Sequence, residues 1–355
     1  MDNNYNPNGQ FGGWGQGAYG GYSAPYYNYY NEQYERQKEK KNDKKLLKTM
    51  GKWFGLSIVS FTVLASIFGV VIGLLSSVIP KIELLYSDGN MSMAYQIVAS
   101  VLFIFLPFAI AYVVLKKKKI AGILPLGTTY NKKAATSLTM LFIPLMLFST
   151  FIINLVSTII QNILGITFTT GVEDPKILGF DGFLIATLST AVLPAVLEEL
   201  IIRGIVMQPL RRFGDKFALV ASALIFGIMH GNMVQIPYTV VAGLFMGYLV
   251  IATGSLWPSI ILHFVNNFYS VALLVAYDNF GDTAGAIVSV LFIGLFIILG
   301  IVGGLSYFPM NYKTKLKDGV KSLSTGEKYS ALFLNVPMIF AIIFLLFQTI
   351  GTIDF

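Results

Sequence analysis

The chain has 355 residues, of which 55% are hydrophobic and only 12% are charged, and its mean hydropathy is +0.68. Soluble domains carry about 25% charged residues, so this composition excludes an ordinary soluble globular protein. The formal net charge of +7 does not indicate a nucleic-acid partner, because the basic residues fall in short clusters between apolar runs. We therefore expect a multi-pass protein of the cell membrane with an all-α fold of about eight to nine transmembrane helices.

The first 50 residues differ in composition from the rest of the chain. Residues 1–34 are rich in Gly, Tyr, Asn and Gln and lack the aliphatic residues that could bury a core. This composition predicts a disordered segment. The basic stretch RQKEKKNDKKLLK at 36–48 follows it, and such a stretch is typical of a cytosolic flank that faces anionic lipid. We expect residues 1–50 to form a cytosolic N-terminal region.

Apolar runs long enough to cross a bilayer, which takes about 20 residues, recur along the rest of the chain. They occur at 53–80, 93–115, 134–160, 182–207, 216–232, 235–253, 256–277, 283–308 and 331–350. We divide them into N-terminal transmembrane helices at 51–180, a four-helix core at 181–277 and C-terminal transmembrane helices at 278–355.

The loops between these runs alternate in charge. Lys and Arg cluster before the first run and at 116–119, 132–133, 211–216 and 313–328. The intervening loops carry acidic residues, namely Glu83, Asp88, Glu173, Asp174, Asp278 and Asp282. Basic loops of membrane proteins stay in the cytosol, so the alternation predicts that the basic loops share the side of the N-terminus.

One apolar run, AVLPAVLEELIIRGIV at 191–206, contains three charged residues. A charge at the centre of a membrane-spanning helix costs roughly 2.5–3.5 kcal/mol on insertion scales. Glu199 and Arg203 are four residues apart, with the glutamate first, which favours an ion pair within the helix. Glu198 lies about 100° around the helix from Glu199 and has no such local partner. We expect Glu198 to face a cavity or a polar group of another helix.

The only two histidines of the chain lie in the runs that follow, and Asn267 comes one helical turn after His263. At 1.5 Å per residue, His230, His263 and Glu198 lie at comparable depths in the membrane. A carboxylate and an imidazole can activate a water, while a second imidazole and an amide can stabilise an oxyanion. Glu198, His230, His263 and Asn267 are therefore candidate catalytic residues for amide hydrolysis, with Glu199 and Arg203 in the supporting ion pair.

The same region is open to two other chemistries, a zinc site and a serine hydrolase. Glu198, His230 and His263 could be three ligands of a zinc ion whose fourth position holds water, although the chain has no Cys and no H-E-x-x-H helix. The cofactor is thus undefined by the sequence, with zinc as an alternative to a metal-free site. Ser222 and Ser259 have no aspartate within these runs to complete a triad, which disfavours a serine hydrolase.

Three short motifs resemble those of one family. EELIIRG at 198–204 resembles the EExxxR motif of the CPBP family, the CAAX-protease and bacteriocin-processing (Abi) intramembrane peptidases. FGIMH at 226–230 resembles its FxxxH motif, and HFVNN at 263–267 resembles its HxxxN motif. The motifs are complete, in order and on consecutive predicted helices, and the resemblance covers about residues 180–277.

This resemblance implies an intramembrane endopeptidase that hydrolyses membrane-associated or lipid-linked substrates, either of the CAAX type or of the bacteriocin-processing type. By motif position, it implies that Glu198 and His230 activate the water, that His263 and Asn267 stabilise the oxyanion, and that the Glu199 pair holds the helix. The family is described both as metallopeptidases and with a metal-free glutamate mechanism.

Two functions of other classes remain alternatives. A non-catalytic immunity or binding protein of the membrane would keep the same pocket and cleave nothing. A proton-coupled transporter would use Glu198 and the histidines as a relay, but carriers usually show paired repeats, whereas the polar residues here cluster in one four-helix block. The expected partners are a peptide or protein substrate and the lipid bilayer, and the oligomeric state is not defined by the sequence.

Overall fold

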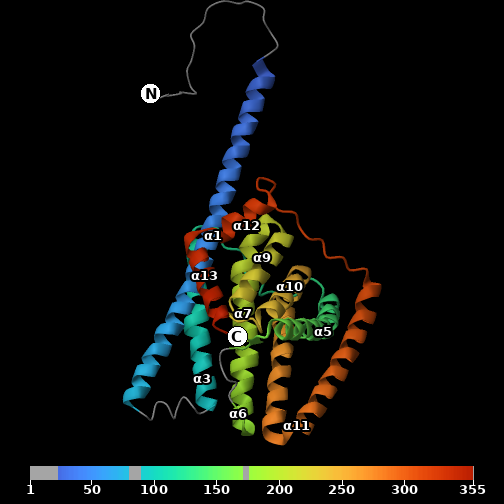
Figure 1. Ribbon diagram of the computed structural model, residues 1–355. Helices are drawn as coiled ribbons and strands as arrows, with labels where there is room; N and C mark the ends of the chain where they lie inside the picture. Colours follow the sequence, from blue (N-terminus) through green and yellow to red (C-terminus); the bar gives the residue numbers. More distant parts are fainter. Residues whose placement is uncertain (1–22, 80–88, 171–175, 355) are drawn as a thin grey trace, which may run out of the picture. The chain divides into compact units, whose positions relative to one another are not determined.

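Helices dominate the structure, a computed structural model that describes residues 23–79, 89–170 and 176–354 (Figure 1). The described residues up to Asn42 form one unit of the chain, and those from Asp43 onward form a second. Helix α1 (Ser23–Val78) begins in the first unit and continues into the second. Residues 23–34 are thus helical where the sequence predicted disorder, and residues 1–22 lie outside the described residues.

The elements of the N-terminal third are α1, α3 (Gly89–Ala99), the π-helix η1 (Ser100–Phe105), α4 (Leu106–Lys117) and α5 (Lys132–Leu164). The central elements are α6 (Gly179–Ala186), the π-helix η2 (Thr187–Val192), α7 (Leu193–Glu199), the π-helix η3 (Leu200–Val206), α8 (Met207–Leu210), the 3₁₀-helix η4 (Arg211–Phe213), α9 (Asp215–Ile228) and α10 (Ile236–Thr253). The last elements are α11 (Trp257–Tyr307), the 3₁₀-helix η5 (Phe308–Met310), α12 (Thr325–Phe333) and α13 (Val336–Ile350). Two short strands, β1 (Thr167–Phe168) and β2 (Ile353–Asp354), pair antiparallel with Thr167 opposite Asp354.

Within the described residues, six stretches are long and apolar enough to cross a membrane, or up to seven if α12 and α13 form one bent span. They are Asn31–Val78, Met91–Lys117, Lys132–Leu164, Gly179–Phe213, Ile236–Thr253 and Trp257–Met310. The predicted all-α membrane bundle is therefore confirmed.

The differences from the predicted runs have local causes. Helix α9 has 14 residues, which is shorter than the length needed to span a bilayer. The runs predicted at 256–277 and 283–308 belong to one 51-residue element, α11, which is interrupted at Gly281. Gly281 has φ 79° and ψ −178°, a conformation that essentially only glycine adopts, so α11 consists of two helices joined by a tight break. Helix α13 bends by 78° from α12.

Three of the predicted basic segments meet at one end of the second unit. The Asp43 carboxylate accepts hydrogen bonds from Arg212 Nη2 (3.1 Å) and Ser322 Oγ (2.6 Å). The Asp215 carboxylate likewise accepts from Arg211 (2.7 Å) and from the backbone N–H of Lys317 (2.9 Å). The start of α1 in this unit, the 211–216 loop and the 313–324 segment therefore lie on one side, as the charge alternation predicted.

The acidic loop at 278–282, which the structure describes, lies against the start of α6. The Asp278 carboxylate accepts from the backbone N–H of Ile177 (2.8 Å), and Asn279 Oδ1 accepts from the backbone N–H of Gly179 (2.9 Å). The break in α11 thus lies against the loop before α6. The acidic positions 83, 88, 173 and 174 lie outside the described residues.

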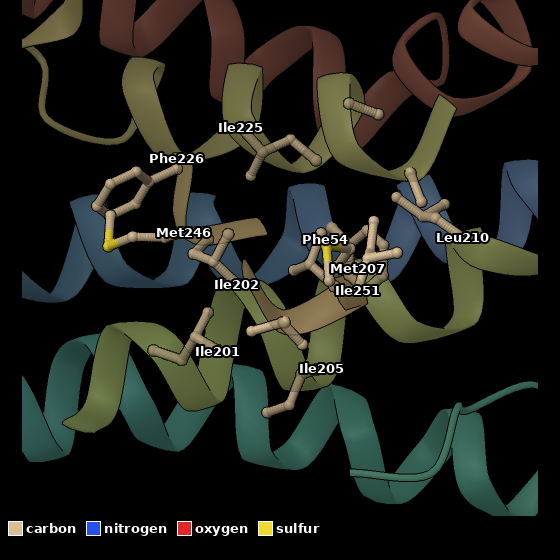
Figure 2. Close-up of a cluster of buried hydrophobic side chains, with 14 of the residues drawn as sticks. Phe54, Ile201, Ile202, Ile205, Met207, Leu210, Ile225, Phe226, Met246 and Ile251 are labelled. Carbon is tan, nitrogen blue, oxygen red and sulfur yellow. The ribbon is translucent and has the colours of Figure 1, made fainter. Parts of the chain in front are cut away.

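The core of the second unit surrounds η3 and α8, because these helices bury side chains all around their circumference. Figure 2 shows Ile201, Ile202 and Ile205 of η3 with neighbouring side chains from other helices. Those neighbours are Phe54 of α1, Met207 and Leu210 of α8, Ile225 and Phe226 of α9, and Met246 and Ile251 of α10. A helix that is apolar on every side is suited to the centre of a bundle, and this packing fixes the end of α7 that carries both glutamates.

Helix α5 packs closely on the second half of α11, and glycines make this approach possible. A Cβ at Gly303 would lie 2.6 Å from the carbonyl oxygen of Ser137 and 2.7 Å from the amide nitrogen of Leu141. At Gly300 a Cβ would collide with the ring of Pro144, the proline inside α5. Small residues at such contacts let two membrane helices approach backbone to backbone.

Candidate active site

The ion pair predicted within the 191–206 run is present at the junction of α7 and η3. Arg203 Nη1 donates to Glu199 Oε1 at 2.8 Å, and both side chains are fully buried. Arg203 Nη2 also donates to the carbonyl oxygen of Gly243 (3.3 Å), and the guanidinium lies over the ring of Phe226 at 4.6 Å. Removing one partner of such a buried pair lowers the free energy of unfolding by about 3–5 kcal/mol, so the stability of the fold depends on both Glu199 and Arg203.

His263 of α11 lies between the two glutamates. Its Nδ1 is 3.1 Å from Glu199 Oε1, and its Nε2 is 3.9 Å from Glu198 Oε2. Because a carboxylate paired with Arg203 can only accept, Nδ1 carries the proton of this hydrogen bond. In the neutral ring Nε2 is then unprotonated and faces Glu198. A separation of 3.9 Å is too long for a direct hydrogen bond but suits one water between the two groups.

His230 follows the end of α9 and is held by the FxxxH stretch itself. Its Nδ1 donates to the carbonyl oxygen of Phe226 at 2.9 Å, so its neutral ring also has Nε2 as the free acceptor. The Phe226 ring makes edge-type contacts with both imidazoles, at 4.9 Å from His230 and 6.1 Å from His263. Phe226 thus packs against both histidines and the Arg203 guanidinium, which explains an aromatic residue at this position.

A cavity of about 790 Å³ brings the candidate residues together. Glu198, His230, His263 and Asn267 all line it, whereas Glu199 and Arg203 lie behind its wall. The Glu198 side chain is 24% exposed and the adjacent Glu199 side chain 0%. Glu198 therefore faces the cavity, whereas Glu199 pairs with Arg203 within the helix. A smaller cavity of about 150 Å³ adjoins Glu198 and His230.

The asparagines of the HFVNN motif form a chain of hydrogen bonds along this wall. Asn267 Nδ2 donates to the carbonyl oxygen of Thr190 at 3.0 Å. Asn266 Nδ2 donates to Asn267 Oδ1 at 3.1 Å and to the hydroxyl of Tyr238 at 2.6 Å. Tyr238 also lines the cavity. Tyr238 carries no signal in the sequence, since a tyrosine near the start of an apolar run is ordinary in membrane proteins.

Three π-helical segments border the site. Ser100, Phe103 and Ile104 of η1 and Ser189 and Thr190 of η2 line the large cavity. Residues of η3, which directly follows the glutamates, line the small cavity. π-Helices hold well under 1% of residues in soluble proteins and concentrate at functional sites, so their clustering here supports a functional cavity.

A zinc site would need Glu198, His230 and His263 to point their donor atoms at one position. Both imidazoles use Nδ1 on a protein acceptor, which is also the pattern of metal-bound histidines. In the part of the chain that the structure describes, however, no three His, Cys, Asp or Glu side chains are grouped to hold an ion. The arrangement of Glu198, His230 and His263 therefore does not fit a zinc site, and no reaction step is assigned to a metal.

The fold and the cavity define an α-helical membrane protein with a cavity among its helices that is lined by apolar side chains and several polar ones. Residues 180–269 match the family model described as Type II CAAX prenyl endopeptidase Rce1-like. This match confirms, over that segment, the resemblance to the CAAX-protease family drawn from the three motifs, and the family implies a protease. The matched segment runs from α6 into the first half of α11, and α1 to α5 lie outside it. No curated protein and no solved structure matches the chain.

Proposed function

We propose that this protein is an intramembrane endopeptidase that hydrolyses peptide bonds of membrane-associated or lipid-linked substrates with an activated water. The observation that carries the proposal is the 3.9 Å separation between Glu198 Oε2 and His263 Nε2 on the wall of a cavity that His230 also lines. A carboxylate and an imidazole at this spacing can hold one water and take its proton.

The reaction follows from these groups. The water between Glu198 and His263 transfers a proton to Glu198 as its oxygen bonds to the carbonyl carbon of the substrate. The electron pair of the C=O bond moves to the oxygen and gives a tetrahedral oxyanion, which nearby donors stabilise. The C–N bond then breaks, and the proton held by Glu198 passes to the leaving amine. His230, whose Nε2 is free, is a second base on the same wall.

This assignment differs from the family pattern in one respect. The resemblance pairs Glu198 with His230 for water activation and gives His263 to the oxyanion. Here the imidazole next to Glu198 is His263, whose Nδ1–H donates its hydrogen bond to Glu199. A neutral His263 therefore has no proton on Nε2 to donate to an oxyanion, and we place it on the water side of the reaction.

The cavity suits a peptide of the membrane. Its volume of about 790 Å³ lies in the range of 300–1,000 Å³ typical of ligand pockets, and its walls combine apolar side chains with a few polar groups. It also lies among helices that are apolar enough to span a bilayer. We propose that the basic ends of these helices, with the N-terminus, face the cytosol of a cell membrane.

The proposal is tested by comparing membrane peptides from cells that express the wild type, Glu198→Ala, or the control Asp318→Ala. Asp318 is exposed in the segment that leads to α12. Peptides produced by the wild type and the control should be absent with Glu198→Ala, because loss of a general base costs about 10²–10⁴ in rate. If Glu198→Ala, His230→Ala and His263→Ala all retain the biological activity, the protein is a non-catalytic binding or immunity protein instead.

A further inference from the structure

The candidate active site contains several hydrogen-bond acceptors but few hydrogen-bond donors that could reach a substrate. The Nδ1 of each histidine lies against a protein acceptor, so in a neutral ring Nε2 is an acceptor, and the Glu198 side chain adds two further oxygen acceptors. A tetrahedral oxyanion needs hydrogen-bond donors aimed at the position where its charge develops. Asn267 supplies one such donor, and a second has to come from another residue of the wall.

The hydrogen bonds of Asn266 identify that donor. A primary amide has two N–H groups, and those of Asn266 point to the Tyr238 hydroxyl (2.6 Å) and to Asn267 Oδ1 (3.1 Å). The Tyr238 oxygen is therefore the acceptor in its bond with Asn266. Its own O–H is left free to donate, and Tyr238 lines the cavity with Glu198 and both histidines.

Asn267 is oriented in the same way. Its Oδ1 accepts from Asn266, and one N–H of its Nδ2 donates to the carbonyl oxygen of Thr190. The second N–H of Asn267 is left for a ligand in the cavity. Asn266 thus fixes two donors, one on α10 and one on α11, while having no free N–H of its own.

We propose that Tyr238 is a further catalytic residue of this site, an inference that rests on the proposed function. Its hydroxyl donates to the oxyanion together with the Nδ2 of Asn267, and Asn266 is the residue that positions both donors. Water activation by Glu198 and His263 and oxyanion stabilisation by Tyr238 and Asn267 are then separate tasks. The short bond to Asn266 orients the hydroxyl before substrate binds, which is the condition for strong transition-state stabilisation.

The test compares Tyr238→Phe with Tyr248→Phe, using a peptide that the wild type cleaves in detergent or liposomes. Tyr248 lies on the same helix, is partly buried and does not line the cavities described above, so it is a matched control. Removing one oxyanion donor lowers kcat by about 10²–10³-fold. We expect that loss for Tyr238→Phe with little change in KM, and a kcat near wild type for Tyr248→Phe.

A second variant keeps the tyrosine ring and changes only the direction of its hydrogen bond. In Asn266→Asp the new carboxylate accepts from the Tyr238 hydroxyl, so the proton is no longer free. We expect kcat to fall about as far as in Tyr238→Phe. Substrate affinity, measured in a Glu198→Ala background, should not depend on whether residue 238 is Tyr or Phe, which separates a transition-state role from a structural one.

The outcomes are distinct. If the wild type cleaves the peptide and Tyr238→Phe turns it over as fast as Tyr248→Phe does, the assignment of Tyr238 is wrong while the peptidase proposal stands. If Tyr238→Phe loses substrate affinity in the Glu198→Ala background in proportion to its loss of activity, Tyr238 serves ground-state binding and the assignment is also wrong. If the wild type shows no Glu198-dependent cleavage, the peptidase proposal itself fails.

Discussion

Glu199 Oε1 accepts hydrogen bonds from both His263 Nδ1 (3.1 Å) and Arg203 Nη1 (2.8 Å), so one buried oxygen joins the ion pair to the candidate catalytic imidazole. Arg203 keeps Glu199 in its charged, accepting form, and Glu199 in turn fixes which nitrogen of His263 carries the proton. The ion pair therefore acts on the reaction through His263, in addition to its role in packing.

Adjacent glutamates give a matched test of this division of roles. Glu199→Ala leaves Arg203 buried without its partner and should lower the free energy of unfolding by about 3–5 kcal/mol. Glu198→Gln changes a carboxylate that faces the cavity, so it should abolish turnover and leave stability near that of the wild type. Thermal unfolding in detergent and peptide cleavage are measured for both. Equal stability of the two variants would contradict the structural role of Glu199.

Metal content tests the alternative zinc site. Because no three donors are grouped to hold an ion within the described residues, the purified protein should carry no stoichiometric zinc, and chelators should not reduce its activity. Elemental analysis of the wild type and His263→Ala measures this directly. Stoichiometric zinc that is lost in His263→Ala would instead make Glu198, His230 and His263 metal ligands and refute the metal-free mechanism.

Two glycines on α11 give a matched test of the packing against α5. Gly303 is buried, and a Cβ there would contact backbone atoms of α5, so Gly303→Ala should destabilise the protein by about 1–3 kcal/mol. Gly294 has nothing within 4 Å, so Gly294→Ala should stabilise by about 0.5–1 kcal/mol through higher helix propensity. Relative to the wild type, the unfolding midpoint should fall for Gly303→Ala and rise for Gly294→Ala. A stabilised Gly303→Ala variant would contradict the close approach of α5 and α11.

The predicted orientation of the chain in the membrane can be tested by labelling introduced cysteines. The wild type should give no labelling, because the chain contains no cysteine. Lys315 and Thr283 are exposed near the basic and the acidic ends, and Lys315→Cys and Thr283→Cys place one thiol at each. In intact cells an impermeant maleimide should label only Thr283→Cys, and permeabilised cells should also show labelling at position 315. The reverse pattern would invert the orientation, and labelling of both variants in intact cells would contradict the alternation of the loops.

Local features of the site could be predicted from the sequence. The four-residue spacing of Glu199 and Arg203 places both on one helix face, which leaves Glu198 as the residue without a partner on its own helix. The loop charges likewise predicted that the segments around residues 43, 212 and 322 share one side of the bundle. These predictions depend on helical geometry and on membrane topology alone.

Features that depend on packing between helices could not be predicted in this way. The position of His263 between two glutamates requires the register of α11 against α7, which no local pattern encodes. The same holds for Tyr238, whose hydroxyl is identified only by its bond to Asn266 of another helix. The shortness of α9 was missed because its apolar run continues into the turn at His230 and Gly231.

The π-helical turns of η1, η2 and η3 have a consequence for how this chain tolerates insertions and deletions. A wide turn of this kind holds one residue more than an α-helical turn, so removing a single residue from Leu200–Val206 could restore regular α-helix without breaking the span. The side chains before and after the deletion would then keep about their present relative directions, because the π-turn had absorbed the extra residue, whereas the same deletion in a regular α-helix rotates one side by about 100°. Glu198 would therefore keep its direction relative to the helix beyond Val206, so this segment should tolerate a one-residue deletion that a regular membrane helix would not.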